Sequence, residues 1–186
     1  MKTQKIIILT GNDTRHQFFI HHLNAKFSIS EIYIEKSTYP FPCPQSKEES
    51  VAWNWFFQRR DRYEKKLVLD SGQLLSKNKP RMIYLDENEL NSPHTIIKIE
   101  KTNPRFIAVF GVGILREPFL KKLPNRLFNM HLGDPEIYRG SSCNFWPIYQ
   151  GKLQHLSTTI HRIDQGVDTG DILFKQAVIM SEEDNE

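Results

Sequence analysis

Asn129 and His131 are the two residues of this 186-residue chain whose types and spacing could act together on a reacting carbonyl group. They lie two positions apart at the end of an apolar run, so in a β-strand their side chains point to the same face. An amide N–H can stabilise the oxyanion of a tetrahedral intermediate, and an imidazole can add a proton or a positive charge. An Asn-x-His pair alone, however, is more often a strand end with a satisfied histidine.

Asp168 lies in a second polar segment, residues 163–171, which places three carboxylates around two glycines. Glycine lets the chain turn closely around a ligand and leaves backbone groups free for a flat heterocycle. An aspartate brought near His131 would orient the imidazole ring and favour its protonated form. The alternative is a surface turn with solvated carboxylates.

The predicted strands and helices that must position these residues alternate along the chain, which indicates an α/β fold with a mainly parallel central sheet flanked by helices. Apolar runs predict strands at 5–10, 29–35, 82–85, 106–110, 127–131, 157–163 and 172–179. Helices are expected after the turn at 11–13, over 46–75 as one long or two short helices, at 91–102 and at 117–123. Three prolines break the chain at 39–44. In such sheets, ligands bind beyond the carboxyl ends of the strands, where Asn129, His131 and residues 111–115 fall.

The composition, with 39% hydrophobic and 25% charged residues, indicates one globular domain. No apolar run approaches the roughly 20 residues of a membrane-spanning helix, and no signal-peptide pattern occurs, so we expect a cytoplasmic protein with no membrane partner. Cys43 and Cys143 lack metal-ligand spacing, which favours reduced thiols. The net charge of +3 is mild and the basic residues are scattered, which argues against nucleic-acid binding.

Three motifs follow one another in the sequence, and their order makes a chance arrangement of these polar residues improbable. They are Phe128-Asn129-Met130-His131, then Pro135 with Tyr138-Arg139-Gly140, then Thr159-Ile160-His161 leading to Asp168-Thr169-Gly170. This pattern resembles the folate-dependent formyltransferase family, which includes methionyl-tRNA formyltransferase, glycinamide ribonucleotide formyltransferase and the N-formyltransferases of nucleotide-linked amino sugars. The resemblance is strong over 104–180. It implies a Rossmann-like formyltransferase domain over 1–186, with a helical, aromatic-rich insertion at 40–90.

The resemblance also implies the roles of individual residues. The catalytic residues would be Asn129, His131 and Asp168, with no metal. The formyl donor would be 10-formyltetrahydrofolate, bound by Val112, Gly113, Ile114, Leu115, Asp164, Gln165, Gly166 and Val167. The amine substrate would be bound by Gly11, Asn12, Asp13, Tyr138, Arg139 and Gly140.

The chain departs from the family pattern in two places. The usual His-Pro-Ser is replaced by His131-Leu132-Gly133, with Asp134 next to it, and the chain ends soon after the last motif strand, as a truncated or minimal form would. The acceptor we expect first is a nucleotide-linked amino sugar, then methionyl-tRNA, then glycinamide ribonucleotide. The different class left open is a catalytically silent folate- or nucleotide-binding module. The aromatic cluster at 51–63 is expected to be core packing rather than a ligand-stacking surface, and the oligomeric state is not indicated.

Overall fold

The computed structural model describes residues 5–36, 44–70 and 78–181, and these form a seven-stranded sheet in the order β3-β2-β1-β4-β5-β6-β7. The strands are β1 (Ile6–Thr10), β2 (Ile29–Glu35), β3 (Arg81–Leu85), β4 (Phe106–Phe110), β5 (Leu127–His131), β6 (Ser157–Arg162) and β7 (Ile172–Ala177). The first five run parallel, and β6 and β7 continue the sheet antiparallel. The predicted α/β fold with a mainly parallel sheet is confirmed.

The strand order reverses between β1 and β4. The chain builds outward from β1 through β2 to β3, then returns to place β4 on the other side of β1. The carboxyl ends of β1 and β4 therefore face each other at a switch point, which is where doubly wound sheets bind ligands. The turn after β1 starts at Gly11, and the turn after β4 starts at Gly111.

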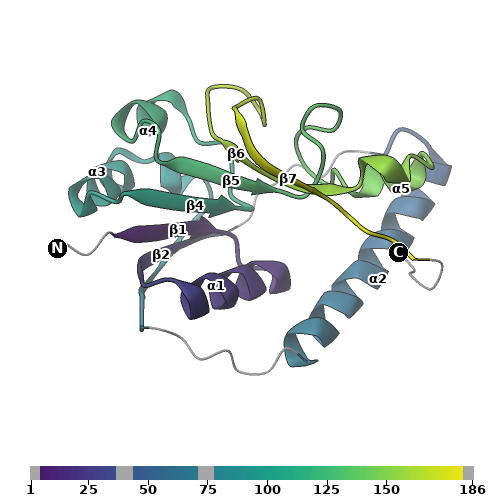
Figure 1. The fold of residues 1–186 in the computed structure, drawn as a ribbon, viewed down its shortest axis with the longest axis horizontal. Helices are drawn as coiled ribbons and strands as arrows, with labels where there is room; N and C mark the ends of the chain where they lie inside the picture. The colour runs from purple at the N-terminus through teal and green to yellow at the C-terminus, as the bar shows by residue number, and fades with distance from the viewer. Residues whose placement is uncertain (1–4, 37–43, 71–77, 182–186) are drawn as a thin grey trace.

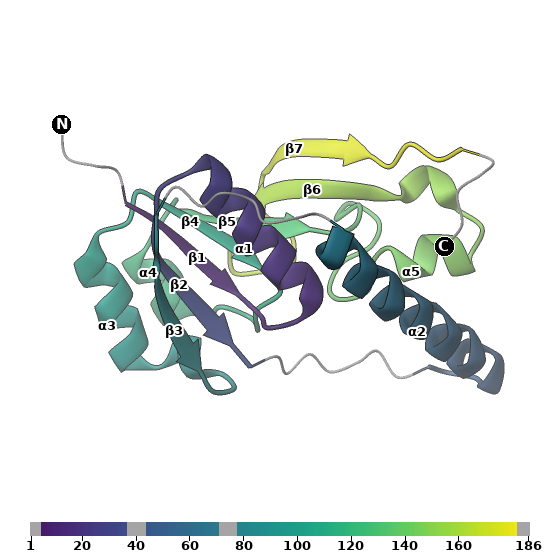
Figure 2. The ribbon, with the colours of Figure 1, turned by 90° about the horizontal axis from the view of Figure 1, so that it is seen from below.

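Alternate residues of the central strands fill two separate cores. On one face Ile7, Leu9, Ile107 and Val109 pack with side chains of α3 (Pro93–Thr102) and α4 (Glu117–Lys122). On the opposite face, Ile8, Ile32 and Ala108 pack against α1 (Thr14–Lys26). Figures 1 and 2 show α1 on one side of the sheet and α3 with α4 on the other. The β-branched runs thus form strands buried on both faces.

Local capping chemistry sets the ends of α3. The Ser92 side chain accepts a hydrogen bond from the backbone N–H of Thr95, and Pro93 occupies the first turn. Asn103 ends the helix in the left-handed conformation, with φ of 49°. The expected helix at 91–102 therefore begins two residues later, after a 3₁₀ turn at Glu89–Asn91.

The segment expected as a helical insertion contains α2 (Lys47–Asp70), one long helix, and also supplies the edge strand β3. Trp53 of α2 is 7% exposed and packs on Phe145 and Trp146 of α5 (Phe145–Tyr149), so the core packing expected of the cluster at 51–63 holds for Trp53, whereas Val51 and Tyr63 are 63% and 60% exposed and depart from it. Trp55 is half exposed. Residues 39–43 of the proline-rich segment lie outside the described residues. Among the helices described, none combines the length and apolarity needed to cross a membrane.

Candidate active site

The structure brings together the three residues predicted as catalytic. Asn129 and His131 lie on the same face of β5, and both contact the carboxylate of Asp168, which comes from the bend between β6 and β7. The Asn129 Nδ2 donates to Asp168 Oδ1 over 3.3 Å, and His131 Nδ1 lies 3.4 Å from Asp168 Oδ2. Asp168 adopts a positive φ of 51°, which Asp tolerates better than most residues and which turns its side chain into the site.

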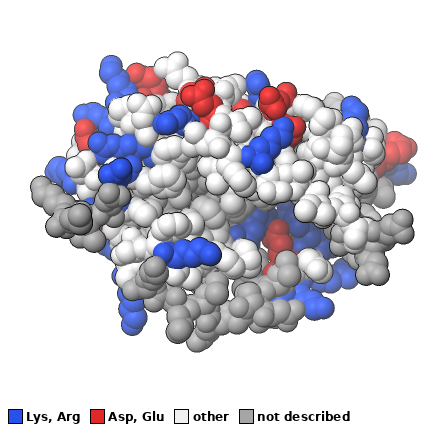
Figure 3. Space-filling view, in the orientation of Figure 1, with Lys and Arg blue, Asp and Glu red and all other residues white. Residues whose placement is uncertain are grey.

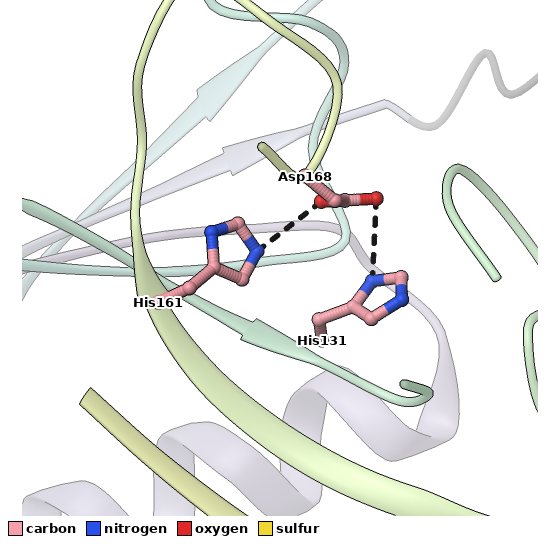
Figure 4. A group of neighbouring side chains, drawn as sticks. All are labelled: His131, His161 and Asp168. Carbon is pink, nitrogen blue, oxygen red and sulfur yellow. Dashed lines mark ion pairs between the residues drawn. The ribbon is translucent and has the colours of Figure 1, made fainter. Parts of the chain in front are cut away.

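His161 completes this group and was not predicted as a site residue. It lies on β6, directly opposite Asn129 in the antiparallel register, and is 2% exposed. Its Nε2 lies 3.2 Å from Asp168 Oδ1, and Figure 4 shows Asp168 between the two imidazoles with one carboxylate oxygen toward each. The signal available in the sequence was the alternation of 157–163, which sets His161 on one face with Ser157 and Thr159.

The Asp168 carboxylate favours a proton on His161 Nε2, whereas the Asn129 Nδ2, a donor 3.2 Å from the same nitrogen, favours a lone pair there. Nδ1 donates to the Arg162 carbonyl over 2.7 Å, and Nε2 faces the Asp168 carboxylate. Burial opposes the charge, but these partners outweigh burial and raise the pKa of His161. Burial likewise opposes ionisation of Asp168, yet the hydrogen bonds from His161 and Gly140 hold the pKa of Asp168 below its ordinary value. Asp168 thus stabilises the protonated form of His161, and the two form a buried ion pair whenever that ring is charged.

The protonation of His131 depends on a balance between burial and the Asp168 carboxylate. Its Nε2 contacts the Tyr138 carbonyl at 3.1 Å, so Nε2 carries the proton and Nδ1 is the nitrogen that faces Asp168. Asp168 favours the charged ring as predicted, but burial is the larger effect and lowers the pKa of His131. The expected effect of Asp168 on His131 is therefore present, but burial outweighs it. The neutral ring directs a lone pair at a carboxylate oxygen, which leaves room for one proton between them.

The loop after β5 holds this arrangement in place. The Gly140 backbone N–H donates to Asp168 Oδ2 over 2.8 Å, on the same oxygen that faces His131. A Cβ on Gly133 would lie 2.5 Å from the Cys143 Cβ and 2.9 Å from His131 Nε2, so only glycine fits there. The buried Asp134 binds Lys175 Nζ of β7 at 2.7 Å. The departures from the family pattern at Gly133 and Asp134 therefore bear directly on the site.

The two segments predicted to bind the folate are both connected to the core cluster that includes α3 and α4. Val112 and Leu115 are buried in the core cluster of α3 and α4, and Ile163, just before the second segment, packs on the same cluster. The Ile114 side chain is 68% exposed, while the Gly113 N–H donates to Glu35 Oε2 over 3.2 Å and the Ile114 carbonyl accepts from Asn91 Nδ2 over 2.9 Å. In the second segment Asp164 bonds to its own loop, accepting from the Gly166 N–H and the Thr169 hydroxyl, while residues 165–167 are exposed.

The residues predicted to bind the amine substrate fall into two places. Tyr138 and Gly140 contact His131 and Asp168, as described above, and Arg139 is exposed with its Nε bonded to the Pro135 carbonyl. Gly11, Asn12 and Asp13 instead form the turn after β1, and no contact described joins them to the catalytic group.

The buried ring of His16 fills the switch point between Gly11 and Gly111. Its Nδ1 accepts from the Asp13 N–H over 3.0 Å, and burial lowers the pKa of His16 to about 4. Beyond it a cavity of about 570 Å³ opens at the ends of β1, β2 and β3, lined by Asn12, Asp13, Ile34, Lys36, Tyr84, Leu85, Asp86 and Glu89. The switch point itself is thus occupied by a neutral side chain, and the open space lies to one side of it.

Comparison with known proteins agrees with this geometry. Residues 58–186 match the family model described as formyl transferase. Methionyl-tRNA formyltransferase of Caldanaerobacter subterraneus subsp. tengcongensis is 32% identical over 100 residues, covering 53% of this chain and 32% of the relative. The corresponding enzyme of Clostridium botulinum is 35% identical over 102 residues, covering 54% and 33%. The matched region thus spans about a third of the length of these curated relatives.

Solved structures share the fold. The phosphoribosylglycinamide formyltransferase of Bacillus halodurans superposes with a TM-score of 0.62 at 15% identity, over 98% of this chain and 83% of that one. A formyltetrahydrofolate deformylase of Pseudomonas syringae pv. tomato gives 0.60 at 9% identity, over 99% and 54%. The family predicted from the ordered motifs is confirmed by the match over 58–186, and the chain belongs to the formyl transferase family.

Proposed function

We propose that this chain transfers the formyl group of 10-formyltetrahydrofolate to a primary amine. The observation that carries the proposal is the shared carboxylate of Asp168, which contacts Asn129, His131 and His161 at 3.2 to 3.4 Å. Addition of an amine to a carbonyl carbon is helped by a hydrogen-bond donor, which stabilises the oxyanion, and by a base, which removes the amine proton. The group around Asp168 offers both. The donor supplies a formyl group on an amine nitrogen, and the reaction moves that group to the nitrogen of the acceptor.

Proton removal is assigned to the gap between His131 Nδ1 and Asp168 Oδ2. An amine that attacks a carbonyl carbon becomes positively charged and must lose a proton before the intermediate can collapse forward. The two acceptor atoms lie 3.4 Å apart, and neither bears a proton when His131 is neutral. The proton of the amine is therefore accepted between His131 Nδ1 and Asp168 Oδ2, and from there it can be transferred to the departing nitrogen of the donor.

Stabilisation of the oxyanion is assigned to the Asn129 amide, assisted by the charge of His161. The Asn129 Nδ2 carries two hydrogens; one bonds to Asp168, and the other is available to the oxyanion when His161 Nε2, 3.2 Å away, is protonated and cannot accept it. Burial opposes the charge of His161, but its contact with Asp168 raises its pKa, and in the buried site the field of the protonated ring is weakly screened. Both groups are held in place before the substrate arrives, because β5 and β6 pair directly at Asn129 and His161.

The donor is proposed to bind across residues 112–115 and 164–167. Ile114 and Val167 expose 68% and 45% of their surface, which offers apolar contact to a flat ring. The buried side chains of Val112 and Leu115 anchor the first segment, so its backbone groups hold a fixed position. These features support the fit of a pterin-like heterocycle beside the catalytic group.

For the acceptor we propose the amino group of a nucleotide-linked sugar. A phosphate at the turn after β1, as glycinamide ribonucleotide would require, is disfavoured because the Asp13 carboxylate lies at the start of α1. The nearby cavity of about 570 Å³ offers carboxylates and Tyr84, which suit sugar hydroxyl groups. Lys and Arg side chains are dispersed among acidic and uncharged ones on the face drawn in Figure 3. The second candidate is methionyl-tRNA, because the curated relatives carry that name.

The experiment that tests the proposal is a formyl-transfer assay with the purified chain and 10-formyltetrahydrofolate. The acceptors are a panel of nucleotide-linked 4-amino sugars, initiator methionyl-tRNA and glycinamide ribonucleotide, and mass spectrometry detects a gain of one formyl group. We expect transfer to an amino sugar. Transfer to methionyl-tRNA alone would select the second candidate. Tight folate binding without transfer to any acceptor would instead identify a silent binding module.

A further inference from the structure

We propose that His131, His161 and Asp168 also form a binding site for a divalent transition-metal ion such as Zn²⁺, and that the bound ion stops formyl transfer. The inhibition rests on the proposed function, whereas the binding does not. One ligand atom from each of the three residues lies within 4.8 Å of the others, and both histidines are buried. Two imidazole nitrogens and a carboxylate are a donor set that zinc and similar ions bind in proteins.

The two histidines already have the orientation of metal ligands. Each donates its far ring N–H to a backbone carbonyl, His131 to Tyr138 over 3.1 Å and His161 to Arg162 over 2.7 Å. Metal-ligating histidines are held in this way, because the outer hydrogen bond fixes the tautomer and aims the other nitrogen at the ion. The nitrogens left over are His131 Nδ1 and His161 Nε2, and both face Asp168. No ring has to rotate for an ion to bind, but a protonated His161 must release its Nε2 proton to solvent as the ion enters.

The separations also fit. In a tetrahedral zinc site with bonds of about 2.0–2.1 Å, neighbouring ligand atoms lie roughly 3.3–3.4 Å apart. The His131 Nδ1 to Asp168 Oδ2 distance is 3.4 Å and the His161 Nε2 to Asp168 Oδ1 distance is 3.2 Å. These two distances end on different carboxylate oxygens, so binding through one oxygen requires the other imidazole to approach it and the two nitrogens to approach each other, from separations of at most 4.8 Å. Three protein ligands leave one position open, which a water can fill, as in zinc sites with an exchangeable ligand.

The neighbouring carboxylates do not compete for the ion. Asp134 and Glu136 bind the Lys175 ammonium at 2.7 and 3.0 Å, so a cationic side chain already satisfies them. An ion at the three-residue site would take the lone pair of His131 Nδ1 and the charge of Asp168. These are the two groups assigned to accept the proton of the amine, so they cannot accept it while they bind an ion.

The test is a titration of the full chain with Co²⁺, followed by the visible absorption of tetrahedral cobalt, and then displacement by Zn²⁺. We expect one Co²⁺ per chain, with binding at least 10-fold weaker in His131→Gln and in His161→Gln. His94→Gln, which removes an exposed histidine of α3, is the matched control and keeps the affinity of the unmodified chain. Zn²⁺ is expected to inhibit formyl transfer, and EDTA to restore it.

Folded variants that bind Co²⁺ as tightly as the unmodified chain would place the ion elsewhere and overturn the site. If the variants do not fold, the ¹⁵N resonances of the histidine rings in the unmodified chain decide the matter. Zn²⁺ should shift the signals of His131 and His161, and unchanged signals overturn the proposal. Binding without inhibition would overturn the inhibitory part. Binding to a chain that transfers no formyl group would support the site and contradict the proposed function.

Discussion

Replacing Asp168 by asparagine keeps the shape of the side chain but cannot satisfy its surroundings in either orientation. One carboxylate oxygen receives the Gly140 N–H and faces His131, while the other receives His161 and Asn129. An amide group offers one acceptor and one donor. If the NH₂ lies toward His131, it opposes the Gly140 N–H. If it lies toward His161, it opposes two donors and removes the partner of a buried positive charge.

The cost can be estimated from these contacts. One buried donor left without an acceptor costs about 1–3 kcal/mol, so Asp168→Asn should lower the free energy of unfolding by about that amount. The variant also loses the proton-accepting gap, and a single general base contributes roughly 100- to 10,000-fold to the rate. We therefore expect kcat to fall by at least about 100-fold, with little change in KM for the formyl donor. Initial rates of formyl transfer and urea denaturation measure the two effects.

Asp171→Asn is the matched control, since Asp171 is exposed three residues later on the same bend and should change neither kcat nor stability by much. Full activity in folded Asp168→Asn would refute the assignment of proton removal. A loss of activity that simply tracked a loss of folded protein would reduce Asp168 to a structural residue.

Three further changes test the surroundings of the site. Gly133→Ala places a Cβ 2.9 Å from the His131 ring, and we expect kcat to fall at least 10-fold while urea denaturation still shows a folded protein. Burial opposes ionisation of Asp134, but the hydrogen bonds from Lys175 and a backbone N–H lower the pKa of Asp134 below its ordinary 3.8. The ionised Asp134 therefore stabilises the folded protein above pH 3.8, and this stabilisation is lost as the pH falls through the lowered pKa. Asp134→Asn should therefore unfold with about 1–3 kcal/mol less free energy at pH 7, and the difference should shrink below pH 3.8; a pH-independent difference would contradict the ion pair. Trp53→Ala should cost about 3–5 kcal/mol, against about 1 kcal/mol or less for the half-exposed Trp55→Ala, and equal losses in thermal denaturation would show that α2 does not pack as described.

Several elements were predictable because their signals are local. The runs at 6–10 and 106–110 are apolar and β-branched, and strands buried on both faces need that composition. The two-residue spacing of Asn129 and His131 fixed their common face, because side chains alternate along a strand. The short helix α5 was missed, since five residues with an internal proline show no periodicity and are held by packing of Phe145 on Trp53.

By itself, then, the sequence determined the α/β class, the family and the group of Asn129, His131 and Asp168, because these depend on strand periodicity and on ordered motifs. Only the tertiary structure decided that His161 joins them, since this depends on the antiparallel pairing of β5 with β6, which sets His161 opposite Asn129, 32 positions earlier in the chain. It also decided that the pKa of His131 is lowered while the pKa of His161 is raised. The pKa of a buried imidazole is the balance of desolvation and partners from several distant segments, and no local pattern carries that balance.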